Sequence, residues 1–138
     1  GRISGPGDTT SRVILLTDAA SAVPAIIQPS GQSALIRGDN SMAPVIDFLE
    51  NAESVRPGDR VTSSGDGGVF PAGLLIGQVA AAPSGQLRVR LAADYERLEY
   101  LRVLRHHGTE SVADPGHVVA PSAPVAQAES TQPDPGDG

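Results

Sequence analysis

The chain has 138 residues, which is enough for one ordinary domain or two very small ones. Its formal net charge is −6, from 10 Arg, no Lys and 16 acidic residues. Residues 1–107 hold all 10 Arg and 11 acidic residues, a net of −1, whereas residues 108–138 hold 5 acidic residues and no Arg, a net of −5. A near-neutral body with an acidic end argues against nucleic-acid binding and against a polybasic membrane surface, because both need a basic footprint.

The composition excludes several further classes of protein. The chain has no Cys, which rules out thiolate metal sites, thiol catalysis and disulfides. No apolar run approaches the roughly 18 residues of a spanning helix, and the first residues do not resemble a secretion signal. With 16 Gly, 12 Pro and only two Phe and two Tyr, the sequence favours a small β protein with many turns and an aliphatic core.

Four short strands are predicted in the first 50 residues, at 12–17, 22–28, 33–37 and 45–49. Each is rich in aliphatic residues and is bounded by Gly, Pro, Asp or Asn. Pro24 cannot donate a ladder hydrogen bond, so we expect its strand to lie on a sheet edge or to carry a bulge.

The second half continues with turns and short strands. Pro57-Gly58 predicts a type II turn, after which Val61 opens an extended segment that enters a glycine-rich loop. Segments 74–80 and 87–91 are expected to form a hairpin. A short helical piece is predicted at 92–98, capped by Asp94, and a final strand at 100–105. Residues 108–138 have too few bulky apolar side chains to offset their ordering entropy, so we expect disorder.

Seven or eight short strands separated by turns are typical of a small barrel or of two half-barrels. The chain opens directly on strand-like residues, Gly1-Arg2-Ile3. An antiparallel barrel cannot close without its first strands, so we expect the chain to be the C-terminal portion of a longer protein.

The richest local motif is residues 63–71, Ser-Ser-Gly-Asp-Gly-Gly-Val-Phe-Pro. It is similar to the Gly-Asp-Ser-Gly-Gly loop of trypsin-like proteases, but its order differs. A hydrolase using Ser63 or Ser64 needs a His within about 3 Å, and all three His lie at or beyond the last predicted strand: His106, His107 and His117.

No other chemistry is indicated by these residues. The loop has no Lys and so is no phosphate cradle. His106 and His107 are adjacent on a predicted strand and point to opposite faces, which does not make a chelate. We therefore predict no catalytic residue, no cofactor site and no metal site. The arginines near the end, from Arg88 to Arg105, indicate a solvated face or a patch for an acidic partner.

The motifs resemble one family in order and spacing. Residues 63–77 resemble the signature loop of the MreC family of rod shape-determining proteins, which reads Thr-Ser-Gly-x-Gly-Gly-x-Phe-Pro-x-Gly and then reaches a Val or Ile and a Gly. Segment 11–18, Ser-Arg-Val-Ile-Leu-Leu-Thr-Asp, is similar to the family's Ser-Arg-Val-Leu-Leu-Leu-Thr-Asp stretch. Segments 55–61 and 92–104 resemble its Gly-Asp turn and its last strand. The resemblance covers about residues 1–105, with Ser63 where the family usually has Thr.

This resemblance implies an all-β fold of two small antiparallel barrels, related in topology to trypsin-like proteases but without their triad. Residues 1–38 would be the remainder of a first β-barrel subdomain, 39–106 a second β-barrel subdomain, and 107–138 a disordered acidic, Pro-rich tail. The membrane anchor, the coiled coil and the first strands of the family are expected to be missing from this chain, so the first barrel would be incomplete.

The function that the resemblance implies is a non-enzymatic scaffold of bacterial cell elongation. It would lie on the periplasmic face of the inner membrane, self-associate, bind the penicillin-binding transpeptidase of lateral peptidoglycan synthesis, and work with MreD and MreB. The candidate contact residues are Gly65, Gly67, Gly68, Phe70, Pro71, Gly73 and Gly77. A serine hydrolase and a periplasmic adaptor barrel of an efflux or secretion system stay open as alternatives. Such adaptors carry long helical hairpins, which this sequence does not predict.

Overall fold

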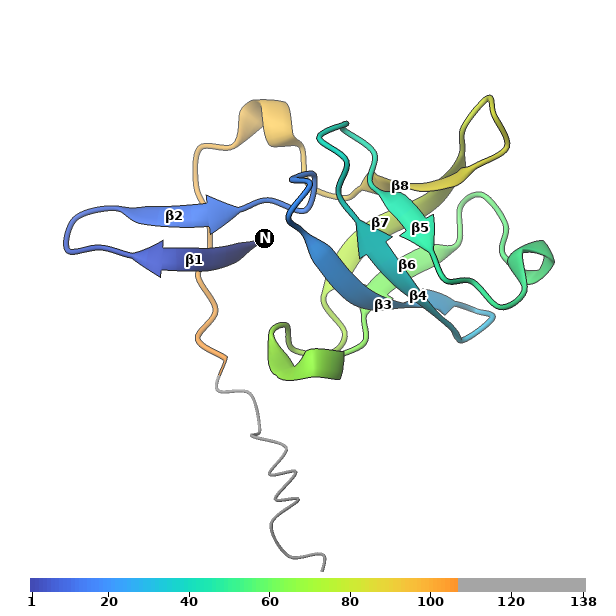
Figure 1. The fold of residues 1–138 in the computed structure, drawn as a ribbon, viewed down its shortest axis with the longest axis horizontal. Helices are drawn as coiled ribbons and strands as arrows, with labels where there is room; N and C mark the ends of the chain where they lie inside the picture. The colour runs from blue at the N-terminus through green and yellow to red at the C-terminus, as the bar shows by residue number, and fades with distance from the viewer. Residues whose placement is uncertain (107–138) are drawn as a thin grey trace, which may run out of the picture.

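The structure, a computed structural model, describes residues 1–106. The described chain is all-β, with eight strands and three single-turn 3-10 helices (Figure 1). The strands are β1 Arg2–Pro6, β2 Ser11–Ile14, β3 Ala22–Gln28, β4 Gln32–Arg37, β5 Val45–Asp47, β6 Arg60–Ser63, β7 Leu75–Ala81 and β8 Leu87–Leu91. The 3-10 helices are η1 Ala52–Ser54, η2 Asp66–Gly68 and η3 Tyr95–Arg97.

Six of the strands close into one antiparallel barrel in the order β3-β4-β5-β8-β7-β6. The ring is completed where β6 returns to pair with β3, with Ala25 opposite Ser63 and Ile27 opposite Val61. The junction between β5 and β8 is the narrowest, with a single residue pair, Val45 and Arg88. Closure leaves the barrel without a free strand edge.

The barrel core follows from alternation along the strands. In β3, residues 23, 25 and 27 are buried, whereas their neighbours point toward solvent. The same alternation buries Ala34 and Ile36 in β4, and Val61 and Ser63 in β6. The buried core cluster is Val23, Ala25, Ile27, Ala34, Ile36, Ile46, Val55, Val61, Ile76, Val79 and Val89. No aromatic side chain is among them, as the composition predicts.

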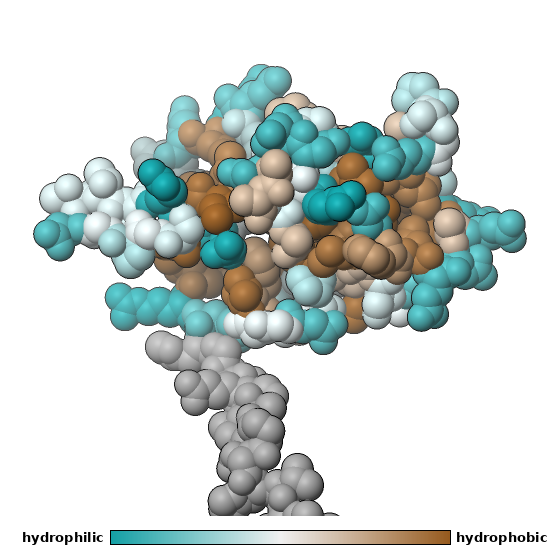
Figure 2. All heavy atoms as spheres, viewed as in Figure 1, coloured by the Kyte–Doolittle hydropathy of each residue, from teal (hydrophilic) through white to brown (hydrophobic). Residues whose placement is uncertain are grey.

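The remaining two strands form a separate hairpin. β1 pairs with β2 across an irregularity between Ile3 and Gly5, and nearly all its residues are exposed. Figure 1 shows the hairpin projecting beside the barrel. On the face drawn in Figure 2, hydrophobic residues gather over the barrel and near the base of the hairpin, whereas the outer end of the hairpin is neutral to hydrophilic. Two-stranded hairpins are marginally stable alone.

The expected subdomain boundary between residues 38 and 39 is not a boundary of the barrel. β3 and β4, which lie before it, pair with β6 and β5, which lie after it. Only the β1–β2 hairpin stands outside the barrel. Its assignment to the remainder of a first barrel stays a prediction, as does the predicted disorder of 107–138, which lies outside the described residues.

Pro24 does not lie on an edge strand, contrary to expectation, because β3 is paired on both sides. The Pro24 carbonyl accepts a hydrogen bond from the Ser64 N–H at 3.0 Å. In an antiparallel ladder, the backbone nitrogen and the carbonyl of one residue face the same neighbouring strand, so the Pro24 nitrogen faces β6 as its carbonyl does. The missing N–H therefore faces β6 one position beyond that strand's last residue, Ser63, where little pairing is lost.

Two predictions for residues 92–105 fare differently. The helical piece is a single 3-10 turn, η3, and its cap is as expected: the Asp94 carboxylate accepts a hydrogen bond from the Glu96 N–H at 3.1 Å. The strand predicted at 100–105 is wrong, because these residues have no strand partner in the described part of the chain.

The type II turn predicted at Pro57-Gly58 is confirmed by the positive φ of 96° at Gly58.

Barrel stability should depend on the fully buried Ile36, which pairs with Val23 on one side and Ile46 on the other. Ile36→Ala should lower the free energy of unfolding by about 2–5 kcal/mol in urea titrations, because it leaves a cavity. Ile3→Ala in the hairpin removes the same atoms from a side chain that is 42% exposed and should cost less than about 1 kcal/mol. Equal costs would contradict this placement of the core.

Candidate functional site

The glycine-rich loop joins β6 to β7 and contains the 3-10 turn η2. Its backbone has positive φ angles at four glycines, Gly65, Gly67, Gly68 and Gly73. Residues with a Cβ rarely adopt this conformation, so the glycines allow the chain to turn back on itself within a few residues. Six of the predicted contact residues lie together in this loop, whereas Gly77 lies further on, inside β7.

Ser63 holds the base of the loop closed. Its side chain is buried, and its hydroxyl donates to the Pro71 carbonyl at 2.6 Å and accepts from the Leu74 N–H at 2.9 Å. The Ser63 N–H donates to the Leu74 carbonyl, and the Ser63 carbonyl accepts from the Gly73 N–H. Four hydrogen bonds from one residue thus fix where the loop leaves and re-enters the barrel.

The neighbouring Ser64 ties the loop to β3 and to its own tip. Its N–H donates to the Pro24 carbonyl, and its hydroxyl donates to the Asp66 carboxylate at 2.9 Å. The Asp66 N–H in turn donates to the Ser64 hydroxyl at 3.2 Å. Both serine hydroxyls are therefore engaged in shaping the loop. Of the three histidines, only His106 lies among the described residues.

Phe70 is half-buried and packs against the barrel core, so it is an aromatic anchor of the loop. The side chains on either side of this anchor face outward: Val69 is 56% exposed and Leu75 is 50% exposed. The loop thus combines a fixed base and a packed Phe with two apolar side chains open to solvent. Such a surface suits contact with another protein.

Two of the predicted contact glycines lie close to other parts of the chain, and Gly77 has no room for a side chain. A Cβ on Gly77 would lie 2.1 Å from the Arg90 carbonyl oxygen of β8, a distance that real side chains do not reach. At Gly65 a Cβ would meet the Ala72 Cβ at 3.0 Å. The β6–β7 register shifts between Val61 and Thr62, next to the Gly77 position, which marks a bulge.

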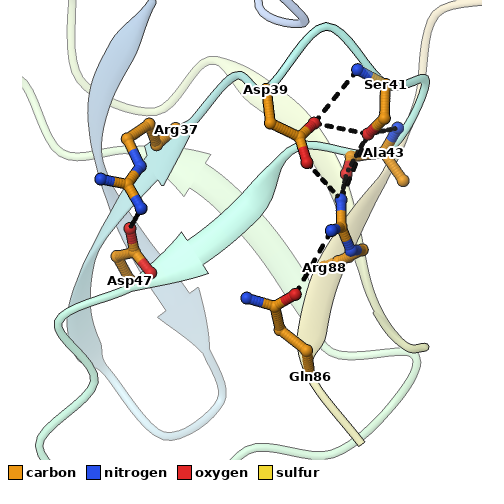
Figure 3. Close-up of polar contacts among 7 residues, drawn as sticks. All are labelled: Arg37, Asp39, Ser41, Ala43, Asp47, Gln86 and Arg88. Atoms are coloured by element: carbon orange, nitrogen blue, oxygen red, sulfur yellow. Dashed lines mark hydrogen bonds and ion pairs between the residues drawn. The ribbon is translucent and has the colours of Figure 1, made fainter. Parts of the chain in front are cut away.

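A second polar cluster was not predicted from the sequence. The Arg88 guanidinium in β8 contacts the Asp39 carboxylate at 2.9 Å, the Ser41 hydroxyl at 3.2 Å and the Ala43 carbonyl at 2.9 Å (Figure 3). Arg37 and Asp47 form a separate pair at 2.6 Å on neighbouring strands. The Arg88 cluster ties the loop before β5 to β8, which supports the narrowest junction of the barrel.

The Asp39 carboxylate is stabilised in its charged form. The Ser41 hydroxyl, the Arg88 guanidinium and the Ser41 N–H all donate to it, and together they lower its pKa from 3.8 to about 2. In η3, burial raises the pKa of the Tyr95 hydroxyl, opposed by a hydrogen bond with the backbone of Leu16. This contact links η3 to the segment that follows the hairpin.

Within residues 1–106, no group of three or more His, Cys, Asp or Glu side chains is placed to hold a metal ion. The same residues include no helix whose length and apolarity would let it cross a membrane.

Comparison with known proteins identifies relatives. The family model described as "Rod shape-determining protein MreC, barrel core" matches residues 1–105. The chain is 65% identical over 129 residues to the cell shape-determining protein MreC of Cereibacter sphaeroides, which covers 93% of this chain and 43% of that protein. The chain spans about two-fifths of the length of the curated relatives it matches.

Solved structures have the same fold. A structure titled MreC aligns with a TM-score of 0.62 at 26% identity, over 70% of this chain and 58% of that one. A structure titled as the major periplasmic domain from the cell shape-determining filament MreC aligns with a TM-score of 0.56 at 27% identity, over 70% of this chain and 65% of that one.

Removing the Ser63 hydroxyl should loosen the loop. Ser63→Ala removes the partner of the part-buried Leu74 N–H and Pro71 carbonyl, so we expect a loss of about 1–3 kcal/mol in urea unfolding and faster amide exchange at Leu74. Ser64→Ala breaks a more exposed contact and should cost less than about 1 kcal/mol. The idea that Ser63 closes the loop would fail if the two variants were equally stable.

The Asp39 cluster predicts a specific acid response. Since the folded pKa is lowered, the stabilisation is present above pH 3.8 and is lost as the pH falls toward 2. Carbon-detected NMR titration should give a midpoint of about 2 for Asp39, and Ser41→Ala should raise it. A midpoint near 3.8 in the native chain would contradict the cluster.

Proposed function

The chain belongs to the MreC family of rod shape-determining proteins, and from this premise we propose that it is a binding module of the machinery that sets cell shape. Proteins of this family are shape-determining proteins and not enzymes. The proposed role is therefore to hold other proteins in place. The observation that carries this proposal is the loop between β6 and β7, which is fixed by Ser63 and exposes Val69 and Leu75.

The partner that we propose for this loop is the penicillin-binding transpeptidase of lateral peptidoglycan synthesis. The closed barrel has no free strand edge, so recognition there must use side chains rather than strand addition. Val69, Leu75 and the rim of Phe70 offer an apolar centre on a rigid frame, and rigidity lowers the entropy cost of binding.

We further propose that the longer protein self-associates, works with MreD and MreB, and places this barrel at the periplasmic face of the inner membrane. The support is family membership together with a related structure whose title names a periplasmic domain and a filament. The β1–β2 hairpin, with its unpaired edges, is the part of the described chain best suited to contact another β-structure.

Neither alternative function finds support. The Ser63 hydroxyl is buried and donates a hydrogen bond to the Pro71 carbonyl, and the Ser64 hydroxyl donates one to the Asp66 carboxylate, so both hydroxyls are engaged within the loop. The adaptor-barrel alternative requires long helical hairpins, whereas the helices among residues 1–106 are single 3-10 turns.

The proposal is tested by charge insertion at the loop. Val69→Asp should weaken binding to the transpeptidase ectodomain about tenfold or more in calorimetric titrations, because a buried unpaired carboxylate costs more than about 1.4 kcal/mol. Val69 is a sharper choice than Phe70, since Phe70 also supports the core and its loss would lower stability.

Val103→Asp is the matched control. Val103 is 65% exposed and lies outside the loop, so binding should be unchanged. Thermal unfolding of both variants should match that of the native chain. If the native chain bound the transpeptidase and Val69→Asp bound equally well, the loop would be excluded as the contact. If the native chain did not bind at all, the choice of partner would be wrong.

A further inference from the structure

The outer face of β6, β7 and β8 carries a row of three polar side chains. Arg60 lies opposite Gln78 in the β6–β7 pairing, and Gln78 lies opposite Arg90 in the β7–β8 pairing. All three residues are exposed, because their neighbours in each strand point into the core. With strands about 5 Å apart, the two arginines stand roughly 10 Å from each other on one surface.

A groove of about 540 Å³ runs along this row. It is lined by Arg60, Leu75, Gly77, Gln78, Arg90, Leu91 and Ala92. A second hollow of about 340 Å³ shares Gln78 and Arg90 and continues the groove toward the Pro57-Gly58 turn. The lining is thus more polar than apolar and carries two guanidinium groups, with no carboxylate among its residues.

The two arginines differ from those that stabilise the fold. Within residues 1–106, the ion pairs involve Arg37 with Asp47, Arg88 with Asp39, and Arg97 with Asp94. In that part of the chain, Arg60 and Arg90 have no carboxylate at ion-pair distance, and Arg90 donates only to the Gln78 side chain, at 2.9 Å. Among the described residues, the two guanidinium groups along the groove therefore have no ion-pair partner.

The complementary charge is found in the same chain. Residues 108–138 carry 5 acidic residues and no Arg, whereas residues 1–107 are nearly neutral. A segment of 31 residues reaches up to roughly 100 Å when extended, so its length does not prevent it from reaching any face of the barrel. A covalent link also gives it an effective concentration on the order of millimolar, which no free acidic partner of similar affinity matches.

We propose that the acidic C-terminal segment, residues 108–138, docks in the Arg60–Arg90 groove of its own barrel. Carboxylates of the segment would accept charge-assisted hydrogen bonds from the guanidinium groups, and its Val side chains would cover Leu75 and Leu91. Because Leu75 and Gly77 also form the exit of the glycine loop, a docked segment would cover one side of the loop.

The chain has no Cys, so one nitroxide label can be attached in the acidic segment through Ser122→Cys. In the full chain at low salt, the label should broaden the amide NMR signals of Gln78, Arg90 and Leu91 more than that of Val13 in the hairpin. Arg60→Gln with Arg90→Gln should reduce the docking constant about threefold to tenfold, as the loss of two exposed ion pairs implies. Arg2→Gln with Arg12→Gln removes the same charge from the hairpin and should leave the broadening unchanged.

Neutralising the segment provides the converse test. The full chain with E110Q, D114N, E129Q, D134N and D137N, carrying the same label, should lose the broadening at the groove, and high salt should have the same effect on the native segment. Broadening that persists in either case, or that is absent from the native chain, would overturn the proposal. Mixing labelled chain with unlabelled ¹⁵N chain should give no broadening; if it does, the occupant is a second copy instead. Because the test uses no other protein, its outcome is independent of the proposed transpeptidase contact.

Discussion

The pairing of β3 with β6 is the constraint on which the rest of the structure depends. It converts a curved sheet into a ring, buries one aliphatic face of each strand, and removes every free edge of the barrel. It also places Ser63, the last residue of β6, at the point where the glycine loop must begin. The hydrogen bonds of Ser63 and Ser64 then attach the loop to the closed ring. The base of the candidate site is therefore held by the same strand that closes the barrel.

The features that local sequence determines were predictable. The strands at 22–28 and 87–91 have the predicted bounds, and the Pro57-Gly58 turn and the Asp94 cap are as expected, because each depends on residues close in sequence. The edge position of Pro24 and the strand at 100–105 were mispredicted, because edges and partners are set by distant segments. The Asp39–Arg88 contact was missed for the same reason, since 49 residues separate its partners.

In the candidate site too, features set by local sequence were predictable, and those set by distant residues were not. The glycines and Phe70 were identified from residue type. The structure gives the loop glycines positive φ angles and packs Phe70 against the core, and their contact with a partner stays a prediction. The part played by Ser63 was missed, although one signal was present. It stands two residues after Val61 and so points inward, and a polar side chain at an inward position needs hydrogen-bond partners. Its partners come from the far end of the loop, which alternation along one strand does not reveal.

Pro24 has a consequence for how the ring assembles. In the native alignment, its nitrogen faces β6 just beyond the last residue of that strand, so the absent donor costs little. If β3 slid by two residues so that Pro24 stood opposite Thr62, the nitrogen would face a carbonyl in the middle of the ladder, which would lose a bond. The proline therefore penalises that misaligned ring while leaving the correct one almost unaffected. Pro24 thereby selects the native register between the two strands that close the barrel.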